Sequence, residues 1–223
     1  MPTHVNALAV MAKAPIPGTV KTRLVPPFTA EQAAELSGAL LADLLDHVQG
    51  LGGAERYLFF TPDHAASLMG GLAGAKFQLL PQRGAELGAR MQAVFADLWA
   101  RGHHKIVLIG GDLPVLPLTC LEQAFAWLDT SAPRVVLGPS RDGGFYLVGM
   151  NRLCADIFAG MTWSHSQVLG DTLEKIKSQN ADAMQLPLWF DVDTPADLVR
   201  LRQLIVSGEN MKNTAGVLRR LGF

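Results

Sequence analysis

Short apolar runs alternate with helical patterns along almost the whole chain, and this alternation restricts the fold more than any other feature. Seven runs have the length and residue types of β-strands: residues 5–11, 56–60, 77–80, 105–109, 134–137, 145–149 and, more weakly, 184–188. Strands that alternate with helices are typical of a parallel sheet covered on both faces. We therefore expect an α/β fold with three layers, α/β/α, around a mostly parallel, Rossmann-like sheet.

The helices are indicated by apolar residues at helical spacing and by start signals. They are expected at residues 30–49, 86–100, 121–128 and 167–178, after Thr194-Pro195, and within the last dozen residues. Thr29 with Gln32, and Thr119 with Glu122, have the spacing of capping boxes. The triplet Asp142-Gly143-Gly144 lies between two strand-like runs and predicts a hairpin, so one strand should run antiparallel to the others.

Size and composition limit the class of protein. With 223 residues and 49% hydrophobic composition, the chain is expected to form one domain, residues 1–223. A charged fraction of 17% and a net charge of −1 give no general attraction for nucleic acid. Cys120 and Cys154 are far apart, which argues against a disulfide framework or a zinc site. No apolar stretch approaches the roughly 20 residues of a membrane span, so we expect a cytoplasmic protein.

The loop after the first predicted strand carries three cations in a chain with few charges. In open α/β sheets, ligands bind beyond the carboxyl ends of the strands, where Lys13, Lys21 and Arg23 are expected. Gly18 permits a close backbone approach, and Lys21 and Arg23 suit charge-assisted contacts with phosphates. A solvated connector is the alternative. Val20 stands where a P-loop needs glycine, and no strand is followed by a dinucleotide-binding glycine motif.

Two further loops carry carboxylates. Asp112 follows the strand at 105–109 and two glycines, where a carboxylate suits Mg²⁺ or Mn²⁺; capping of the next turn is the alternative. In an extended segment Asp191 and Asp193 point to one side, just before the helix at Pro195. They are candidates for a second metal carboxylate, and an ordinary acidic helix start is equally compatible with them.

Several motifs in the same order carry a resemblance to a known superfamily. They are residues 11–24 (MAKAPIPGTVKTRL), 87–91 (LGARM), 109–114 (IGGDLP), 137–146 (LGPSRDGGFY), 162–164 (TWS) and 191–198 (DVDTPADL). Together they resemble the nucleotide-diphospho-sugar transferases, whose fold is of the GT-A type. Within that superfamily the chain is most similar to uncharacterised bacterial glycosyltransferase-like proteins related to phospholactate guanylyltransferase. Two departures are visible: prolines replace the usual glycine-rich first loop, and the Asp-x-Asp motif is reduced to Asp112, followed by Leu113 and Pro114.

The resemblance implies roles for these loops. Lys21 and Arg23 would hold the nucleotide phosphates, Asp112, Asp191 and Asp193 would share a divalent ion, and the Asp142-Gly143-Gly144 turn would border the acceptor pocket. The complete set assigned to nucleotide binding is Lys13, Gly18, Lys21, Thr22, Arg23, Gly111, Gly143 and Gly144. The catalytic candidates are Lys21, Arg23 and Asp142, and Asp142 is the one general base that we can name for a glycosyl transfer.

The function predicted from the sequence is a metal-dependent transfer that uses a nucleoside triphosphate or a nucleotide-sugar and a small-molecule acceptor. Nucleotidyl transfer to a small phosphorylated acceptor is slightly favoured, because it needs little beyond alignment and charge stabilisation, whereas the sequence shows no clear general base for glycosyl transfer. A glycosyltransferase and a non-catalytic module that binds a nucleotide or metabolite are the alternatives.

Overall fold

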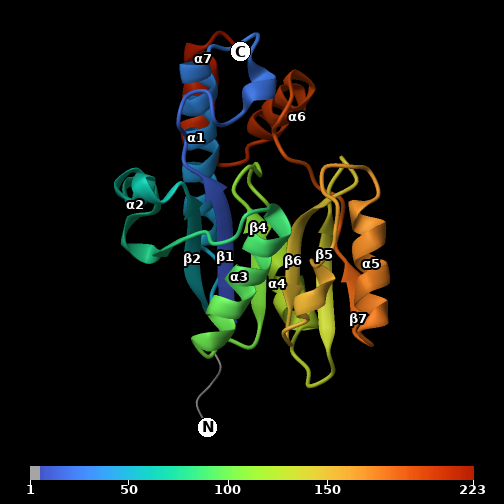
Figure 1. The fold of residues 1–223 in the computed structure, drawn as a ribbon. Helices are drawn as coiled ribbons and strands as arrows, with labels where there is room; N and C mark the ends of the chain where they lie inside the picture. The colour runs from blue at the N-terminus through green and yellow to red at the C-terminus, as the bar shows by residue number, and fades with distance from the viewer. Residues whose placement is uncertain (1–5) are drawn as a thin grey trace.

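A seven-stranded mixed sheet forms the centre of the molecule (Figure 1). The computed structural model describes residues 6–223, so Val5, the first residue of the first predicted strand, lies outside the described residues. The strands are β1 Asn6–Lys13, β2 Ala54–Thr61, β3 Gln78–Pro81, β4 Ile106–Gly110, β5 Arg134–Pro139, β6 Phe145–Met150 and β7 Asp182–Gln185. Their order is β3-β2-β1-β4-β6-β5-β7, and β6 pairs antiparallel with both neighbours, while the remaining pairs are parallel.

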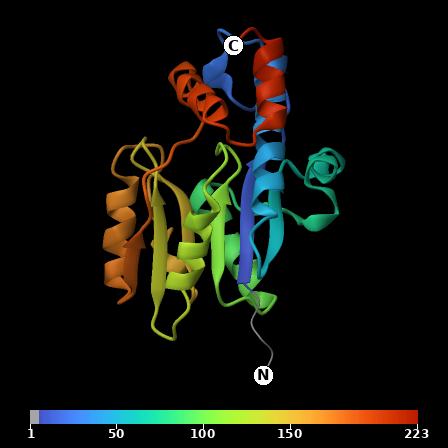
Figure 2. The ribbon, with the colours of Figure 1, turned by 180° about the vertical axis from the view of Figure 1, so that it is seen from behind.

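Helices cover both faces of this sheet, as the alternation of elements predicts. They are α1 Ala30–Val48, α2 Ala66–Ala73, α3 Leu87–Ala100, α4 Leu118–Trp127, α5 Val168–Ser178, α6 Pro195–Val206 and α7 Lys212–Arg220. In Figure 1 α3 lies in front of the sheet, and Figure 2 shows α1 and α4 on the opposite face. The predicted α/β fold with three layers and a mostly parallel mixed sheet is confirmed.

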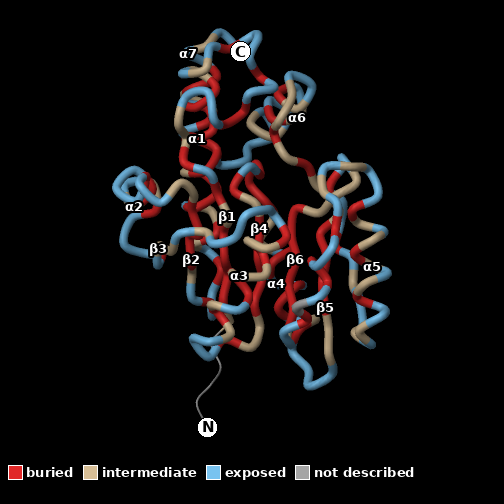
Figure 3. Tube along the Cα trace, viewed as in Figure 1, coloured by how far each residue is buried: buried red, intermediate tan, exposed pale blue. Residues whose placement is uncertain are grey.

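Side-chain alternation in the central strands produces the two layers of core. Leu8 and Val10 of β1 pack in the cluster that includes α1 and α4, whereas Ala7 and Ala9 pack in the cluster that includes α3. All four are completely buried, and Figure 3 shows the central strands in the colour of buried residues. A strand buried on both faces must be apolar throughout, which is why β1 reads as one continuous apolar run.

A third apolar cluster lies beyond the carboxyl ends of the parallel strands, at the top of Figure 1. There the first half of α1 packs with α6, α7 and the segment around Phe28. Asp43 of α1 is buried and accepts hydrogen bonds from the backbone N–H groups of Asn213 and Thr214, at 3.1 and 2.8 Å, and from the Asn213 amide. A side chain of one helix thus caps the N-terminus of another, far away in sequence.

Several local predictions can be compared with the structure. The Thr29/Gln32 capping box and the helix opened by Thr194-Pro195 are both present, and Thr194 also forms a capping box with Asp197. The hairpin at Asp142-Gly143-Gly144 joins β5 to the antiparallel strand β6.

Two local predictions were wrong, and one helix was not predicted. Helix α4 begins at Leu118 after Pro117, without a side-chain cap, so the Thr119/Glu122 box does not form. The sequence analysis missed α2, whose Gly70 and Gly71 weaken the helical signal. The last strand spans Asp182–Gln185 rather than residues 184–188, because Pro187 has no N–H for the ladder. Beyond it the chain pairs again at a bridge between Trp189 and Ser140, which follows β5. Among the described residues, no helix combines the length and the apolar character needed to cross a membrane.

Candidate functional site

A cavity of about 810 Å³ opens at the carboxyl ends of β1 and β4 and the start of β6. These three ends lie at one edge of the sheet because β6 runs antiparallel to β4. The floor is formed by residues 11–13 of β1, 108–111 around the end of β4 and 145–148 of β6. The cavity therefore lies at the sheet edge where the sequence predicts ligand-binding loops.

Lys21, in the loop after β1, contacts one aspartate from each of two other loops beside the cavity. Its Nζ atom lies 2.6 Å from Oδ1 of Asp112 and 3.0 Å from Oδ1 of Asp193. The Lys21 side chain is 1% exposed, whereas the two carboxylates are 55% and 47% exposed. The backbone of Lys21 is left-handed, with φ 49°, which directs this side chain inward at the start of a short 3-10 turn. The structure thus brings together Lys21, Asp112 and Asp193, although Lys21 is paired with carboxylates rather than free for phosphate.

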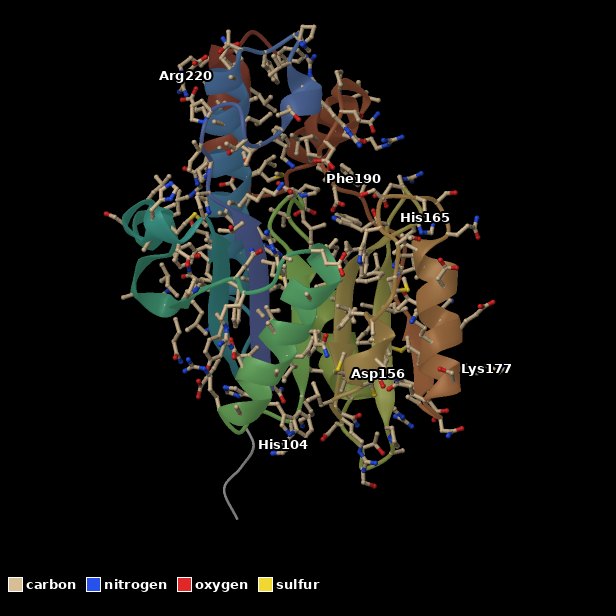
Figure 4. The ribbon with its side chains drawn as sticks, in the orientation of Figure 1. His104, Asp156, His165, Lys177, Phe190 and Arg220 are labelled. Atoms are coloured by element: carbon tan, nitrogen blue, oxygen red, sulfur yellow. The ribbon has the colours of Figure 1, made fainter. Side chains whose placement is uncertain are left out.

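The segment after β7 carries two of the aspartates to the cavity. Phe190 and Val192 are buried in the third apolar cluster, and alternation then turns Asp191 and Asp193 to the other side, where both line the cavity. The Val192 N–H donates to the carbonyl of Asp112 at 3.2 Å, which fixes this segment against the loop after β4. Figure 4 labels Phe190 where the segment passes over the edge of the sheet.

The electrostatics of this corner are dominated by negative charge. Burial, reinforced by the charges of Asp193 and Asp112, raises the pKa of Asp191 to about 7. Burial alone would lower the pKa of Lys21, but Asp112 and Asp193 outweigh it and raise that pKa above its ordinary value. The site therefore contains one carboxyl group whose ionisation is opposed by its neighbours and one lysine that stays charged.

Two of the predicted ligand-binding glycines are required by close packing. A Cβ atom on Gly111 would lie 2.6 Å from that of Ala12, because the end of β4 is pressed against the end of β1. A Cβ atom on Gly143, which has φ +90°, would lie 2.3 Å from the carbonyl oxygen of Ser166. Gly111 also lines the cavity, whereas Gly143 does not. The missing side chain of Gly143 instead lets the 164–167 loop pack on the β5–β6 hairpin.

The remaining predicted residues are divided between the main cavity and a smaller one beside it, of about 190 Å³. Lys13 and Arg23 are exposed and line both cavities, and Thr22 lines the smaller one. Asp142 and Gly144 line the main cavity, with Oδ1 of Asp142 accepting a hydrogen bond from the Gly144 N–H at 3.0 Å. Gly18 lies in a turn and belongs to the lining of neither cavity.

The sequence analysis did not single out Gln82, which also lines the cavity. Its amide nitrogen donates to the carbonyls of Ala12 and Phe59, both at 3.0 Å, and so links the ends of β1 and β2. Gln82 directly follows β3, so the rule that ligands bind beyond strand ends would have found it.

The opposite wall of the cavity is aromatic. Phe145 and Trp163 meet edge to face, with ring centroids 6.3 Å apart, and His165 lies on the same loop as Trp163 (Figure 4). His165 is held by Thr162, whose hydroxyl lies 3.0 Å from its Nε2 atom. Trp163 received no role of its own from the sequence, because a single tryptophan is more often part of a core.

The predicted Mg²⁺ or Mn²⁺ site can be tested against these residues. Nowhere in residues 6–223 do three or more His, Cys, Asp or Glu side chains stand close enough to hold a metal ion as they are. The donor chemistry nevertheless fits a hard divalent cation, because the cavity corner offers three carboxylates from two neighbouring loops. The raised pKa of Asp191 also indicates negative charge that Lys21 alone does not balance. Asp112, Asp191 and Asp193 would be the residues to hold such an ion.

Comparison with known proteins identifies the family. Residues 44–165 match the family model described as "Uncharacterized protein conserved in bacteria (DUF2064)". This chain belongs to the DUF2064 family. A crystal structure from Desulfovibrio desulfuricans G20, named as a candidate nucleotide-diphospho-sugar transferase, is 30% identical, with a TM-score of 0.88 over 96% of this chain and 94% of that one. The predicted resemblance to that superfamily is confirmed.

More distant structures share the fold. Rv0371c from Mycobacterium tuberculosis H37Rv is 19% identical, with a TM-score of 0.56 over 90% of this chain and 99% of that one; it has also been crystallised as a complex with manganese. The inositol-1-phosphate CTP transferase from T. maritima is 17% identical, with a TM-score of 0.53 over 90% and 96% of the two chains. The DUF2064 chain thus has the fold of GT-A type transferases and nucleotidyltransferases.

Proposed function

We propose that this protein is a metal-dependent nucleotidyltransferase that joins the nucleoside monophosphate part of a nucleoside triphosphate to a small phosphorylated acceptor. The observation that carries the proposal is the convergence of Asp112, Asp191 and Asp193 with the exposed cations Lys13 and Arg23 on one cavity. Carboxylates for a metal beside cations for phosphates are the groups that phosphoryl chemistry requires. Likeness to nucleotidyltransferase structures, one of them a CTP transferase, supports the proposal.

In the proposed reaction, a phosphate oxygen of the acceptor attacks the α-phosphorus. A new P–O bond forms, the bond from the α-phosphorus to the bridging oxygen breaks, and pyrophosphate leaves with the electron pair. A divalent cation bound by the carboxylates would supply charge neutralisation for the triphosphate and the departing pyrophosphate.

The residues of the chain would orient the two substrates. Lys13 and Arg23 line both cavities, where they can hold the β- and γ-phosphates. The aromatic wall of Phe145 and Trp163 lines the same cavity and would exclude water from the part that it covers. No general base is needed, because the attacking phosphate oxygen is already ionised at neutral pH.

Glycosyl transfer from a nucleotide-sugar is the second candidate, and two observations favour it. The relative from Desulfovibrio desulfuricans G20 carries the name of a nucleotide-diphospho-sugar transferase, and Asp142 is exposed in the cavity, where a general base would be needed. Oδ1 of Asp142 accepts the hydrogen bond from Gly144, which orients the carboxylate and leaves Oδ2 available.

Thermal unfolding in the presence of ligands distinguishes the candidates, because a ligand that binds the native state raises its melting temperature. The panel contains the nucleoside triphosphates and common nucleotide-sugars, each with Mg²⁺, with Mn²⁺ and with a chelator. A metal-dependent shift with a triphosphate is expected. A shift confined to a nucleotide-sugar would replace the proposal by glycosyl transfer, and no shift with any ligand on folded protein would contradict a nucleotide site.

A further inference from the structure

Lys21 is bound differently from the other cations of the first loop. Its ammonium group contacts Oδ1 of Asp112 and Oδ1 of Asp193, and its side chain is almost completely buried. Lys13 and Arg23 are exposed, and neither forms an ion pair within the described part of the chain. Of the three cations assigned to phosphate binding, one is therefore held by the carboxylates that the proposed function assigns to a metal.

Asp112 and Asp193 cannot fully bind the Lys21 ammonium group and a divalent ion at the same time. Lysine carries a compact point charge, and placing a divalent ion on the same Oδ1 atoms would bring like charges within a few ångströms of each other. Asp112 and Asp193 are each about half exposed, so a cation from solvent can reach them without unfolding of the loop. The flexible four-carbon stem of lysine permits the ammonium group to move while the backbone stays in place.

We propose that Lys21 is an internal counter-ion that a divalent cation displaces from Asp112 and Asp193 into the cavity. This inference rests on the proposed function and adds a coupling to it. In the metal-free protein the lysine pairs with both carboxylates, offsets part of their negative charge and is withheld from phosphate. Metal binding releases the ammonium group, which then faces the ligand. Metal binding and completion of the phosphate site are thus coupled. The apparent metal affinity is lower than the intrinsic affinity, because only molecules in which Lys21 has left the carboxylates can bind the ion.

The first test is the affinity for Mn²⁺ alone, measured by calorimetry or by electron paramagnetic resonance on the full chain without nucleotide. Lys21→Met, which keeps the length of the side chain without its charge, is expected to bind Mn²⁺ roughly tenfold more tightly than the wild type. Lys13→Met is the matched control, because it removes the same charge from the smaller cavity, which both lysines line, and Lys13 pairs with neither carboxylate. It should change the affinity by less than about threefold, as solvent screens an exposed charge. Circular dichroism checks that both variants are folded.

The second test uses the wild-type protein and does not depend on a variant. An amine-acylating reagent modifies accessible lysines, and mass spectrometry measures the modification at each site. Lys21 should be protected in the metal-free protein and become several-fold more reactive at saturating Mn²⁺, relative to Lys13 in the same sample.

The outcomes separate this inference from the proposed function. Equal Mn²⁺ affinity in the wild type and Lys21→Met, with Lys21 still protected, would overturn the counter-ion role and leave metal-dependent transfer intact. Absence of Mn²⁺ binding in both proteins would overturn the inference together with the metal requirement of the proposed function.

Discussion

Two aspartates of this protein, Asp43 and Asp191, illustrate opposite uses of a carboxylate that is taken out of water. Asp43 is buried between α1 and α7, where two backbone N–H groups and one side-chain amide donate to it. Asp191 faces the carboxylates of Asp193 and Asp112, and its pKa is raised to about 7. The first arrangement stabilises the fold, and the second stores unfavourable charge at the edge where a ligand is expected. The difference lies in the neighbours, since the residue type is the same.

The largest effect of a substitution is expected at Asp112, in the carboxylate corner of the cavity. Asp112→Asn removes a carboxylate charge from the cavity corner and keeps the shape of the side chain. We expect turnover in the transfer reaction to fall by two to three orders of magnitude, about the loss seen when one stabilising group is removed from an active site. Steady-state kinetics measures this loss, and the urea midpoint should stay close to that of the wild type. Full activity of the Asp112→Asn variant would show that the Asp112 carboxylate has no role in the reaction.

Substitution of Asp43, in contrast, is expected to lower the free energy of unfolding. Asp43→Ala leaves the buried Thr214 N–H and the two donors of Asn213 without an acceptor at the start of α7, so the free energy of unfolding should fall by about 2–3 kcal/mol. Urea denaturation measures the change. Asp46→Ala, on the exposed side of the same helix, is the matched control and should change it by less than about 0.5 kcal/mol. A similar loss in both variants would mean that α1 alone is weakened.

Removal of the Asp191 charge, which burial and the neighbouring carboxylates disfavour, should stabilise the metal-free protein. A raised native pKa means that the native state binds the Asp191 proton more tightly than the unfolded chain, so its contribution falls as the pH rises from about 4 to 7 and stays low above that. Asp191→Asn should therefore be more stable than the wild type by about 2 kcal/mol at pH 8, with the difference vanishing at pH 4. Chemical denaturation in the presence of a chelator at both pH values tests this. A destabilised variant at pH 8 would show that Asp191 is a satisfied carboxylate like Asp43.

The smallest effect is expected at Asp197, in the same segment as Asp191. Partial burial would raise its pKa, but hydrogen bonds from the Thr194 side chain and from the N–H groups of Thr194 and Asp193 lower it below the ordinary value. Its stabilisation is present above the pKa of the unfolded chain and is lost as the pH falls. Asp197→Asn should cost about 1 kcal/mol at pH 7, and less at acidic pH. As the pH rises, Asp197→Asn should become less stable relative to the wild type, whereas Asp191→Asn should become more stable. A change in the same direction for both variants would contradict the contrast between the two residues.

The position of the cavity was predictable because it depends on local sequence and on one general rule. Apolar runs predict the strands, and ligands bind beyond their carboxyl ends, which was enough to select the loops at Lys13, Asp112 and Asp191. Alternation alone predicted that Asp191 and Asp193 point to one side, since Phe190 and Val192 must be buried. The helix α2 was missed because two adjacent glycines weaken its local signal, and packing on the sheet supplies the rest of its stability.

The partners of the charged residues were beyond the reach of the sequence. Lys21 and Asp193 are 172 positions apart and meet at 3.0 Å because β1, β4 and the segment after β7 end at the same edge of the sheet. Asp43 meets the start of α7 in the same way, 170 positions along the chain. The fold class, the succession of strands and helices along the chain and the loops proposed to bind a ligand could be derived from the sequence, since periodicity and turn residues are local properties. Which carboxylate receives donors, which one faces like charges and which cation is buried could not be derived in this way, because these depend on distances between segments that only folding brings together.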